Sequence, residues 1–288
     1  MGAIYKRELK AYFTGMMGYV FIAFILLVFG IFTSAIQFSQ GSPFFEHTIY
    51  NVDFIFLIVV PILTMRVFAE ERKQKTDQLL YSLPIRVTDV VVGKYLAIVT
   101  VLAVPLLIVS AYPALILQAY GTISLKAAYS TMAGFFFLGC TLLAIGLFMS
   151  SLTENQIVAA VLCFCTLLLS YFMSGLQTLV SSTALASVIA LMALGVALCV
   201  VIWLMTKNWS TAVLVAVVVD VPLYLLYTWK PAALDGVLAK GMGAMAVFDR
   251  MESFVNGMFD LTSIVYFISV TLLFVFFTVQ SVEKRRWS

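Results

Sequence analysis

The sequence predicts an all-α, polytopic membrane protein with about eight transmembrane helices, and three observations support this fold class. Hydrophobic residues make up 63% of the 288 residues and charged residues only 11%, against roughly 25% charged in soluble domains; the mean hydropathy is +1.07. Apolar runs of about 20 residues recur, long enough to cross a hydrocarbon core of ~30 Å as helices. Finally, ten of the 31 charged residues lie in one segment, residues 66–94, between two such runs.

The predicted spans follow one another along a single transmembrane domain, residues 1–288. We expect them at 17–37, 52–67, 95–118, 127–149, 156–179, 184–206, 211–229 and 261–282. The second span is the shortest, and Pro61 is expected to kink it because proline removes a helical hydrogen bond. Cys140, Cys163, Cys165 and Cys199 all fall inside predicted spans. We therefore expect these thiols to pack as small apolar residues rather than to bind metal.

The distribution of basic residues orients the bundle, because Lys and Arg near helix ends resist translocation. An even number of spans puts both termini on one side. Of the 17 Lys and Arg residues, 13 fall on the side of the termini and 4 on the other. The sequence therefore predicts that both termini and residues 66–94 are cytoplasmic, and that the net charge of +3 reflects topology rather than nucleic-acid binding.

Two further segments have amphipathic patterns. Residues 1–16 include an apolar face (Ile4, Tyr5, Leu9, Tyr12, Phe13) opposite charged residues (Lys6, Arg7, Glu8, Lys10). This pattern suits a short interfacial helix, an elbow before the first span; a simple topogenic anchor is the alternative. Residues 230–260 combine apolar residues at helical spacing with interrupting charges and glycines. We expect external amphipathic helices there, which lie on the bilayer or dip into the bundle.

The charged segment 66–94 has an ordinary part and an unusual part. Glu71 with Lys75, and Glu70 with Lys73, have the spacing of ion pairs on a solvated helix. Leu79, Leu80 and Leu83 then share one face before Pro84 ends the helix. Three exposed leucines at the tip of a cytosolic helix indicate a partner surface.

No catalytic signature is present in the sequence. The chain has no G-x-x-x-x-G-K-[ST] phosphate loop and no H-E-x-x-H helix, and His47 is its only histidine. We therefore expect a non-catalytic membrane subunit with no catalytic residues, cofactor or metal site of its own.

Two features inside the predicted spans have alternative interpretations. Asp220 lies near the middle of a span, where a charge costs roughly 2.5–3.5 kcal/mol on insertion scales. One interpretation is that Asp220 lines a substrate or proton path. The other is that Asp220 is protonated or hydrogen-bonded within the bundle. Gly139, Gly146 and Ser150 lie on one stripe of the fourth span. Small residues let helices approach closely, so we interpret the stripe as packing.

The charged segment also resembles that of a known family. It carries a motif at Arg66, Phe68, Ala69, Glu70, Glu71, Arg72, Lys73, Thr76, Leu79, Leu80, Leu83, Pro84, Gly93 and Lys94. This motif is similar to the segment after the second span of type-2 ATP-binding-cassette (ABC) export permeases. The C-terminal region, at Phe254, Gly257, Asp260, Leu261, Tyr266, Phe267, Phe277, Thr278, Glu283, Arg285 and Arg286, resembles the gliding-motility or nitrous-oxide-maturation type of permease.

The resemblance implies a coupling helix at about residues 71–83, which docks into a separate cytoplasmic ABC ATPase subunit that binds Mg-ATP. The ATPase-coupling residues would be Glu70, Glu71, Arg72, Lys73, Thr76, Leu79, Leu80 and Leu83. It also implies a second permease chain, a homodimer being expected, in a bacterial plasma (inner) membrane, with residues 230–260 in the external gate region. The direction of transport, export, is likewise implied by the resemblance.

Two departures from the family accompany this resemblance. Many members have Gly where this chain has Lys75, and the usual permease core has six spans, so 184–229 is an apparent extra pair. An alternative function is an ion-coupled secondary carrier that uses Asp220, although the inverted repeats typical of such carriers are not evident. A membrane enzyme or structural anchor is a third class, for which we find no residue constellation.

Overall fold

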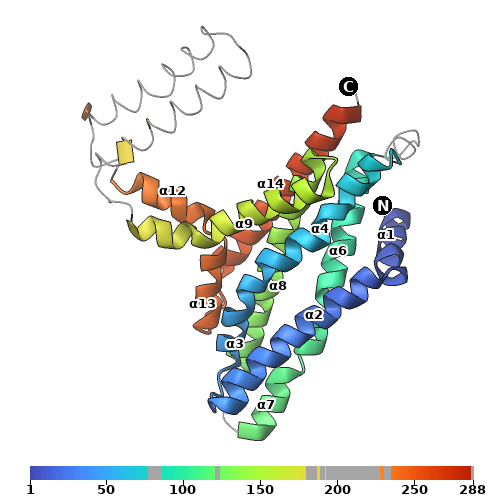
Figure 1. The fold of residues 1–288 in the computed structure, drawn as a ribbon. Helices are drawn as coiled ribbons and strands as arrows, with labels where there is room; N and C mark the ends of the chain where they lie inside the picture. The colour runs from blue at the N-terminus through green and yellow to red at the C-terminus, as the bar shows by residue number, and fades with distance from the viewer. Residues whose placement is uncertain are drawn as a thin grey trace. The chain divides into compact units, whose positions relative to one another are not determined.

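The computed structural model describes residues 1–76, 86–120, 124–179, 187–188, 192, 228–229 and 235–286. Within these ranges every regular element is a helix (Figure 1). The chain divides into two compact units, one formed by residues 1–169 and 247–288 and the other by residues 170–246. The first unit contains the candidate site.

The first unit combines long apolar helices with short helical turns. In chain order, its described helices are α1 (Gly2–Thr14), α2 (Met16–Thr33), η1 (Ser34–Ser39), α3 (Phe45–Val52), η2 (Asp53–Ile55), α4 (Phe56–Lys73), α6 (Val87–Val109), α7 (Tyr112–Tyr120), α8 (Leu125–Leu152), η4 (Phe248–Met251), α13 (Glu252–Val255) and α14 (Leu261–Arg286). Helix α9 (Gln156–Leu179) begins in the first unit and ends in the second, which also contains α12 (Val237–Met245).

Six helical segments of the described chain are long and apolar enough to cross a membrane. They are Met16–Ser39, Phe45–Lys73, Val87–Gln118, Leu125–Leu152, Gln156–Leu179 and Leu261–Arg285. Each corresponds to a predicted span, and the bounds of the fifth agree with the prediction at both ends. The two remaining predicted spans, 184–206 and 211–229, lie almost entirely outside the described residues. Asp220 also lies outside them.

The second span is much longer than the sequence pattern predicts. The pattern predicts residues 52–67, whereas α3, η2 and α4 together run from Phe45 to Lys73. Polar residues interrupt the apolar run of the sequence before residue 52. The helix nevertheless keeps a buried face there, formed by Phe45, Ile49 and Val52. Pro61 lies inside α4, which continues past it. The expectation that this span is the shortest is therefore wrong.

The third span also begins earlier than predicted. Helix α6 starts at Val87 rather than at residue 95, so Lys94 lies inside the helix. Asp89 is in its first turn, where the helix dipole favours a negative charge. Helices α6 and α7 are separated at residues 110–111, because Pro113 has no N–H to donate to the preceding turn.

Helix α8 is the centre of the first unit. It packs against α4, α6 and α14, which lie beside it (Figure 1). A Cβ atom on Gly139 would lie 2.6 Å from Leu102 Cδ2, and one on Gly146 would lie 2.5 Å from Thr64 Oγ1. A larger residue at either position would force its neighbours to shift, so the predicted packing role of the small-residue stripe is confirmed. Ser150 Oγ accepts hydrogen bonds from the backbone of α4 and donates one to Met65 O at 3.2 Å.

The segment that precedes α14 inserts into the first unit. Phe248, Met251 and Phe254 of η4 and α13 are buried, and Thr131 Oγ1 of α8 donates a hydrogen bond of 3.0 Å to Phe254 O. A Cβ on Gly134 would lie 2.7 Å from the Phe254 ring. Residues 248–255 therefore pack against α8 within the first unit. In the second unit, α12 has no buried residues.

Candidate functional site

The end of α4 contains most of the described residues that the sequence predicts to be functional. Glu70, Glu71, Arg72 and Lys73 form the last turn of this helix. The helix ends in a Schellman motif: Lys75 N donates to Arg72 O at 3.0 Å, and Thr76 N donates to Glu71 O at 3.0 Å. Lys75 has a φ of 55°, in the left-handed region that favours glycine. The chain thus makes with Lys75 a turn that usually favours glycine.

Lys94 is the centre of the site. It projects from α6, and its side chain is only 1% exposed. Its Nζ lies 2.8 Å from Glu71 Oε1 of α4 and 3.3 Å from Glu8 Oε1 of α1. The same Nζ donates a hydrogen bond of 3.0 Å to Val67 O and lies 5.2 Å from the Phe68 ring centroid. A buried ammonium is stable only when its charge and its N–H groups have partners, and two neighbouring helices, α1 and α4, supply them here.

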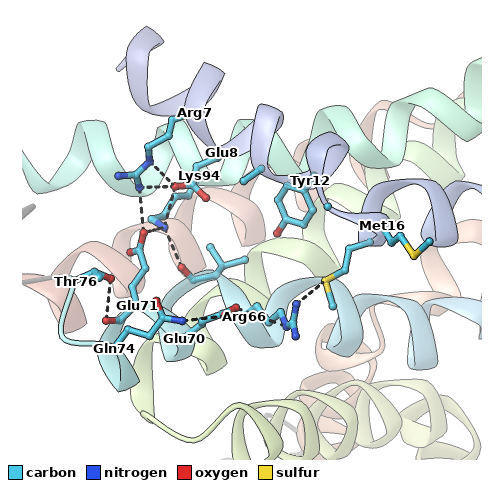
Figure 2. A pocket seen from close by; sticks show the side chains of 14 residues that line it. Arg7, Glu8, Tyr12, Met16, Arg66, Glu70, Glu71, Gln74, Thr76 and Lys94 are labelled. Carbon is cyan, nitrogen blue, oxygen red and sulfur yellow. Dashed lines mark hydrogen bonds and ion pairs between the residues drawn. The ribbon is translucent and has the colours of Figure 1, made fainter.

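Arg7 completes this arrangement, and we call Arg7, Glu8, Glu71 and Lys94 the Lys94 cluster. Arg7 Nη2 lies 3.1 Å from Glu71 Oε1 and also pairs with Glu8. Figure 2 shows Arg7 and Glu8 of α1 directed toward Glu71 of α4 and Lys94. Each carboxylate therefore faces two cations, and each cation faces two carboxylates. The cluster joins α1, α4 and α6 at one end of the first unit, which we call the charged end.

Close packing holds α1 against the same two helices. A Cβ on Gly93 of α6 would lie 3.3 Å from Ile4 Cβ, so the backbone of α6 approaches α1 closely. The Tyr5 hydroxyl lies 3.0 Å from Thr100 Oγ1, and the Tyr12 hydroxyl donates a hydrogen bond of 3.2 Å to Leu63 O of α4. The apolar face predicted for residues 1–16 therefore packs partly on protein.

An open pocket of about 600 Å³ lies beside the Lys94 cluster. Its lining residues come from α1, α4, the turn after α4 and α6: Arg7, Glu8, Ala11, Tyr12, Gly15, Met16, Met17, Arg66, Val67, Glu70, Glu71, Gln74, Thr76 and Lys94. Its lining includes three basic residues, Arg7, Arg66 and Lys94, and three acidic residues, Glu8, Glu70 and Glu71 (Figure 2). The pocket gives solvent access to the end of α4, where the predicted coupling segment begins.

The electrostatics of the α1 face keep its groups in their ordinary protonation states. Burial of the Arg7 guanidinium lowers its pKa, but hydrogen bonds and charges from Glu8 and Glu71 outweigh this effect, and the pKa is raised. Burial raises the pKa of Tyr12, and the nearby Glu8 raises it further. Arg7 therefore stays charged, and the Tyr12 hydroxyl stays a hydrogen-bond donor.

The predicted coupling residues have different surroundings in the structure. Glu71 joins the Lys94 cluster, while Glu70 lies 3.6 Å from Arg66 in an i, i+4 ion pair. The expected Glu71–Lys75 helical pair is wrong, because α4 ends at Lys73 and Glu71 points toward α1 and α6.

The remaining predicted coupling residues lie in the last turn of α4 and after it. Arg72 is buried and Lys73 is exposed. Thr76 Oγ1 donates a hydrogen bond of 3.2 Å to Glu71 O. Leu79, Leu80 and Leu83 lie outside the described residues, as does the helix expected there.

The family resemblance implies that the N-terminal elbow lies alongside the coupling helix, but sequence reasoning does not show which residues of α1 meet the charged segment. The residue pattern assigns Arg7 and Glu8 to the polar face of an interfacial helix, and Lys94 to the end of a loop. One signal is present: Lys94 is followed directly by an apolar run, and a lysine in the early turns of a spanning helix requires an acidic partner. Which acid meets it is not visible in the sequence.

Among the residues that the structure describes, no group of three or more His, Cys, Asp or Glu side chains is arranged to hold a metal ion. The three described cysteines, Cys140, Cys163 and Cys165, are free thiols. The Lys94 cluster is fully paired within itself, so it is suited to holding helices together and does not resemble a reaction centre.

Comparison with known proteins assigns the chain to a family. The family described as "ABC-2 family transporter protein" matches residues 3–185, which include the Lys94 cluster and all of the predicted coupling residues. No curated protein matches the chain. Members of this family are membrane components that imply a partner ATP-binding subunit, and the six apolar helices agree with a multi-pass membrane protein. The chain therefore belongs to the ABC-2 family of transporter proteins and is a membrane permease component of an ABC transporter.

Proposed function

We propose that this chain couples ATP hydrolysis by a separate cytoplasmic ATPase subunit to the export of a substrate. The observation that carries the proposal is the attachment of α4 at the charged end. The segment that leads into residues 77–85 is joined through Glu71 to α6 and α1. Mg-ATP binds to the partner, and this chain contributes no catalytic residue.

Coupling follows from how α4 is held. A partner that displaces the loop after α4 moves Glu70, Glu71, Arg72, Lys73 and Thr76 together, because they form one helical turn and its cap. Lys94 and Ser150 then convey this displacement to α6 and α8. Nucleotide-dependent movement of the ATPase would thus shift the permease between two discrete helix packings.

The proposal also covers the orientation of the chain, its membrane and its oligomeric state. The excess of basic residues beside the termini supports cytoplasmic termini and a cytoplasmic charged end. We place the chain in a bacterial plasma membrane as one of two identical permease chains, each a single transmembrane domain. The C-terminal motif supports the gliding-motility or nitrous-oxide-maturation type, although it lies outside the matched residues 3–185.

The test is complex formation with a candidate ATPase subunit, co-expressed with this chain. Leu79→Asp with Leu80→Asp puts two charges on the predicted contact surface, and we expect loss of the co-purified ATPase and of permease-stimulated ATP hydrolysis. Met258→Asp is the matched control, because Met258 is 61% exposed and lies after α13, away from the charged end. That variant should behave as wild type.

Complex formation that survives the double substitution would refute the leucine contact. Transport that continues without any ATPase, follows an ion gradient and stops in Asp220→Asn would instead establish the secondary-carrier function. These two outcomes separate an incorrect contact surface from an incorrect function.

A further inference from the structure

A second pocket opens between the ends of α8 and α14. It has a volume of about 770 Å³ and is lined by Phe148, Leu152, Phe277, Gln280, Ser281, Lys284 and Arg285. This volume is in the range of ~300–1,000 Å³ that is typical of ligand pockets. Its lining changes from apolar rings and aliphatic groups to polar groups and then to basic groups along α14.

The walls of this pocket are fixed by contacts between α8 and α14. Ser281 Oγ donates a hydrogen bond of 3.3 Å to Ser151 O, and Arg285 Nη2 donates one of 2.7 Å to Leu152 O. The ring centroid of Phe148 lies 5.8 Å from that of Phe277. The pocket is therefore a built feature of this helix pair, with Arg285 already held in place by the protein.

Lys284 differs from Arg285 in its surroundings. Its side chain is exposed at the rim of the pocket. Arg285 also lies 3.5 Å from Glu154, whereas no carboxylate of the described chain pairs with Lys284. The sequence continues with a third basic residue, Arg286. The rim therefore carries positive charge that the described residues do not neutralise.

The depth of the pocket in a membrane follows from helix length. Helix α14 starts at Leu261, and about 20 helical residues cross the hydrocarbon core, which puts Gln280 to Arg285 in the headgroup layer. The helix exposes Leu272, Leu273 and Phe276 on its way there. An apolar track thus leads into a pocket that ends in basic side chains.

We propose that this pocket binds the headgroup and upper acyl chain of one anionic phospholipid. Lys284 attracts the phosphate at the rim, while Phe148 and Phe277 contact the acyl chain. Basic pockets between transmembrane helices are suited to anionic headgroups. A second copy of this chain fits less well, because a two-fold contact centred on the pocket would bring the same basic residues together.

The experiment uses the purified, delipidated full-length chain in detergent. Native mass spectrometry measures the binding of phosphatidylglycerol and of phosphatidylcholine with identical acyl chains. We expect one phosphatidylglycerol per chain, bound about fivefold more tightly than phosphatidylcholine, because one basic side chain at an anionic surface has about this effect. Lys284→Gln should abolish the preference, and Lys284→Arg should keep it.

Lys240→Gln is the matched control, since Lys240 is also an exposed lysine but lies on α12 and does not line the pocket. It should bind phosphatidylglycerol as wild type does. Equal preference in wild type and Lys284→Gln would overturn the proposal, as would displacement of the lipid by equimolar glycerol 3-phosphate, which would indicate a free-phosphate site. A loss of dimer mass in Lys284→Gln would assign the pocket to a second copy instead.

Discussion

The middle of α8 and the charged end hold the first unit together in different ways. In the middle, Gly139 leaves room for Leu102 and Phe56, whose atoms would lie 2.6 and 2.9 Å from an added Cβ. At the charged end, one buried ammonium on Lys94 meets two carboxylates and a carbonyl from other helices. The first contact depends on the absence of a side chain, and the second depends on a few charged atoms.

This difference bears on which part of the permease can move. Tightly interdigitated packing resists small displacements, because each side chain has one arrangement that fits. Ion pairs tolerate an exchange of partners, and Glu71 already lies near both Lys94 and Arg7. We therefore expect a partner that acts on the end of α4 to rearrange the Lys94 cluster while the α8 packing moves as a body.

The largest expected effect comes from removing the centre of the cluster. Lys94→Met leaves Glu8 and Glu71 facing each other at low exposure, and breaking a buried pair from one side costs about 3–5 kcal/mol. We expect a loss near the lower end of this range, because Arg7 still pairs with both carboxylates. The free energy of unfolding, measured from helix content by far-UV circular dichroism in mixed detergent and SDS micelles, checks this value.

A double variant separates the charge from the packing. Lys94→Met with Glu71→Met removes both partners and should recover about half of the loss, because a buried pair replaced by apolar groups is often close to neutral. If the double variant is less stable than Lys94→Met alone, Glu71 has a role other than pairing with Lys94, and the description of the charged end as a charge-held junction is wrong.

A smaller effect is expected in the middle of the bundle. Gly139→Leu forces a side chain into the Leu102 and Phe56 contacts and should cost about 2 kcal/mol, within the usual range for overpacking. Gly30→Leu on α2 is the matched control, because a Cβ there meets nothing within 4 Å. The same unfolding measurement applies. Since leucine is a better helix former than glycine, Gly30→Leu should cost nothing. An equal loss in both variants would mean that close approach at Gly139 does not decide the effect.

Much of the fold follows from composition and spacing. Six predicted spans have counterparts in the structure, since a membrane helix needs a long apolar run whatever its neighbours are. The ends are less predictable. The charges at Glu70 to Lys73 and at Lys94 predict span ends at residues 67 and 95, but the spanning helices continue through these charges, because each charge finds a partner or solvent at the bundle end.

The candidate site is predictable only in part. The sequence singles out Glu71 and its neighbours, but its spacing assigns Glu71 a local partner. Local spacing describes one helix, whereas the Lys94 cluster joins residues 64 and 86 positions apart. Such pairings depend on which helices pack together, and that information is not present in the residue pattern around either end.

The smallest expected effect tests whether the charged end depends on backbone as well as charge. Lys75 has a φ of 55°, and a non-glycine residue in this region costs about 1 kcal/mol. Lys75→Gly should therefore raise the free energy of unfolding by up to about 1 kcal/mol. Lys73→Gly removes the same charge from the last turn of α4, where glycine is unfavourable, and should lower it by about as much. Opposite signs in the two variants would show that the turn after α4 is set by backbone conformation and not by the lysine charges. A loss in both would mean that the lysine charges themselves stabilise this turn. The charged end would then differ from the middle of α8 only through its charges.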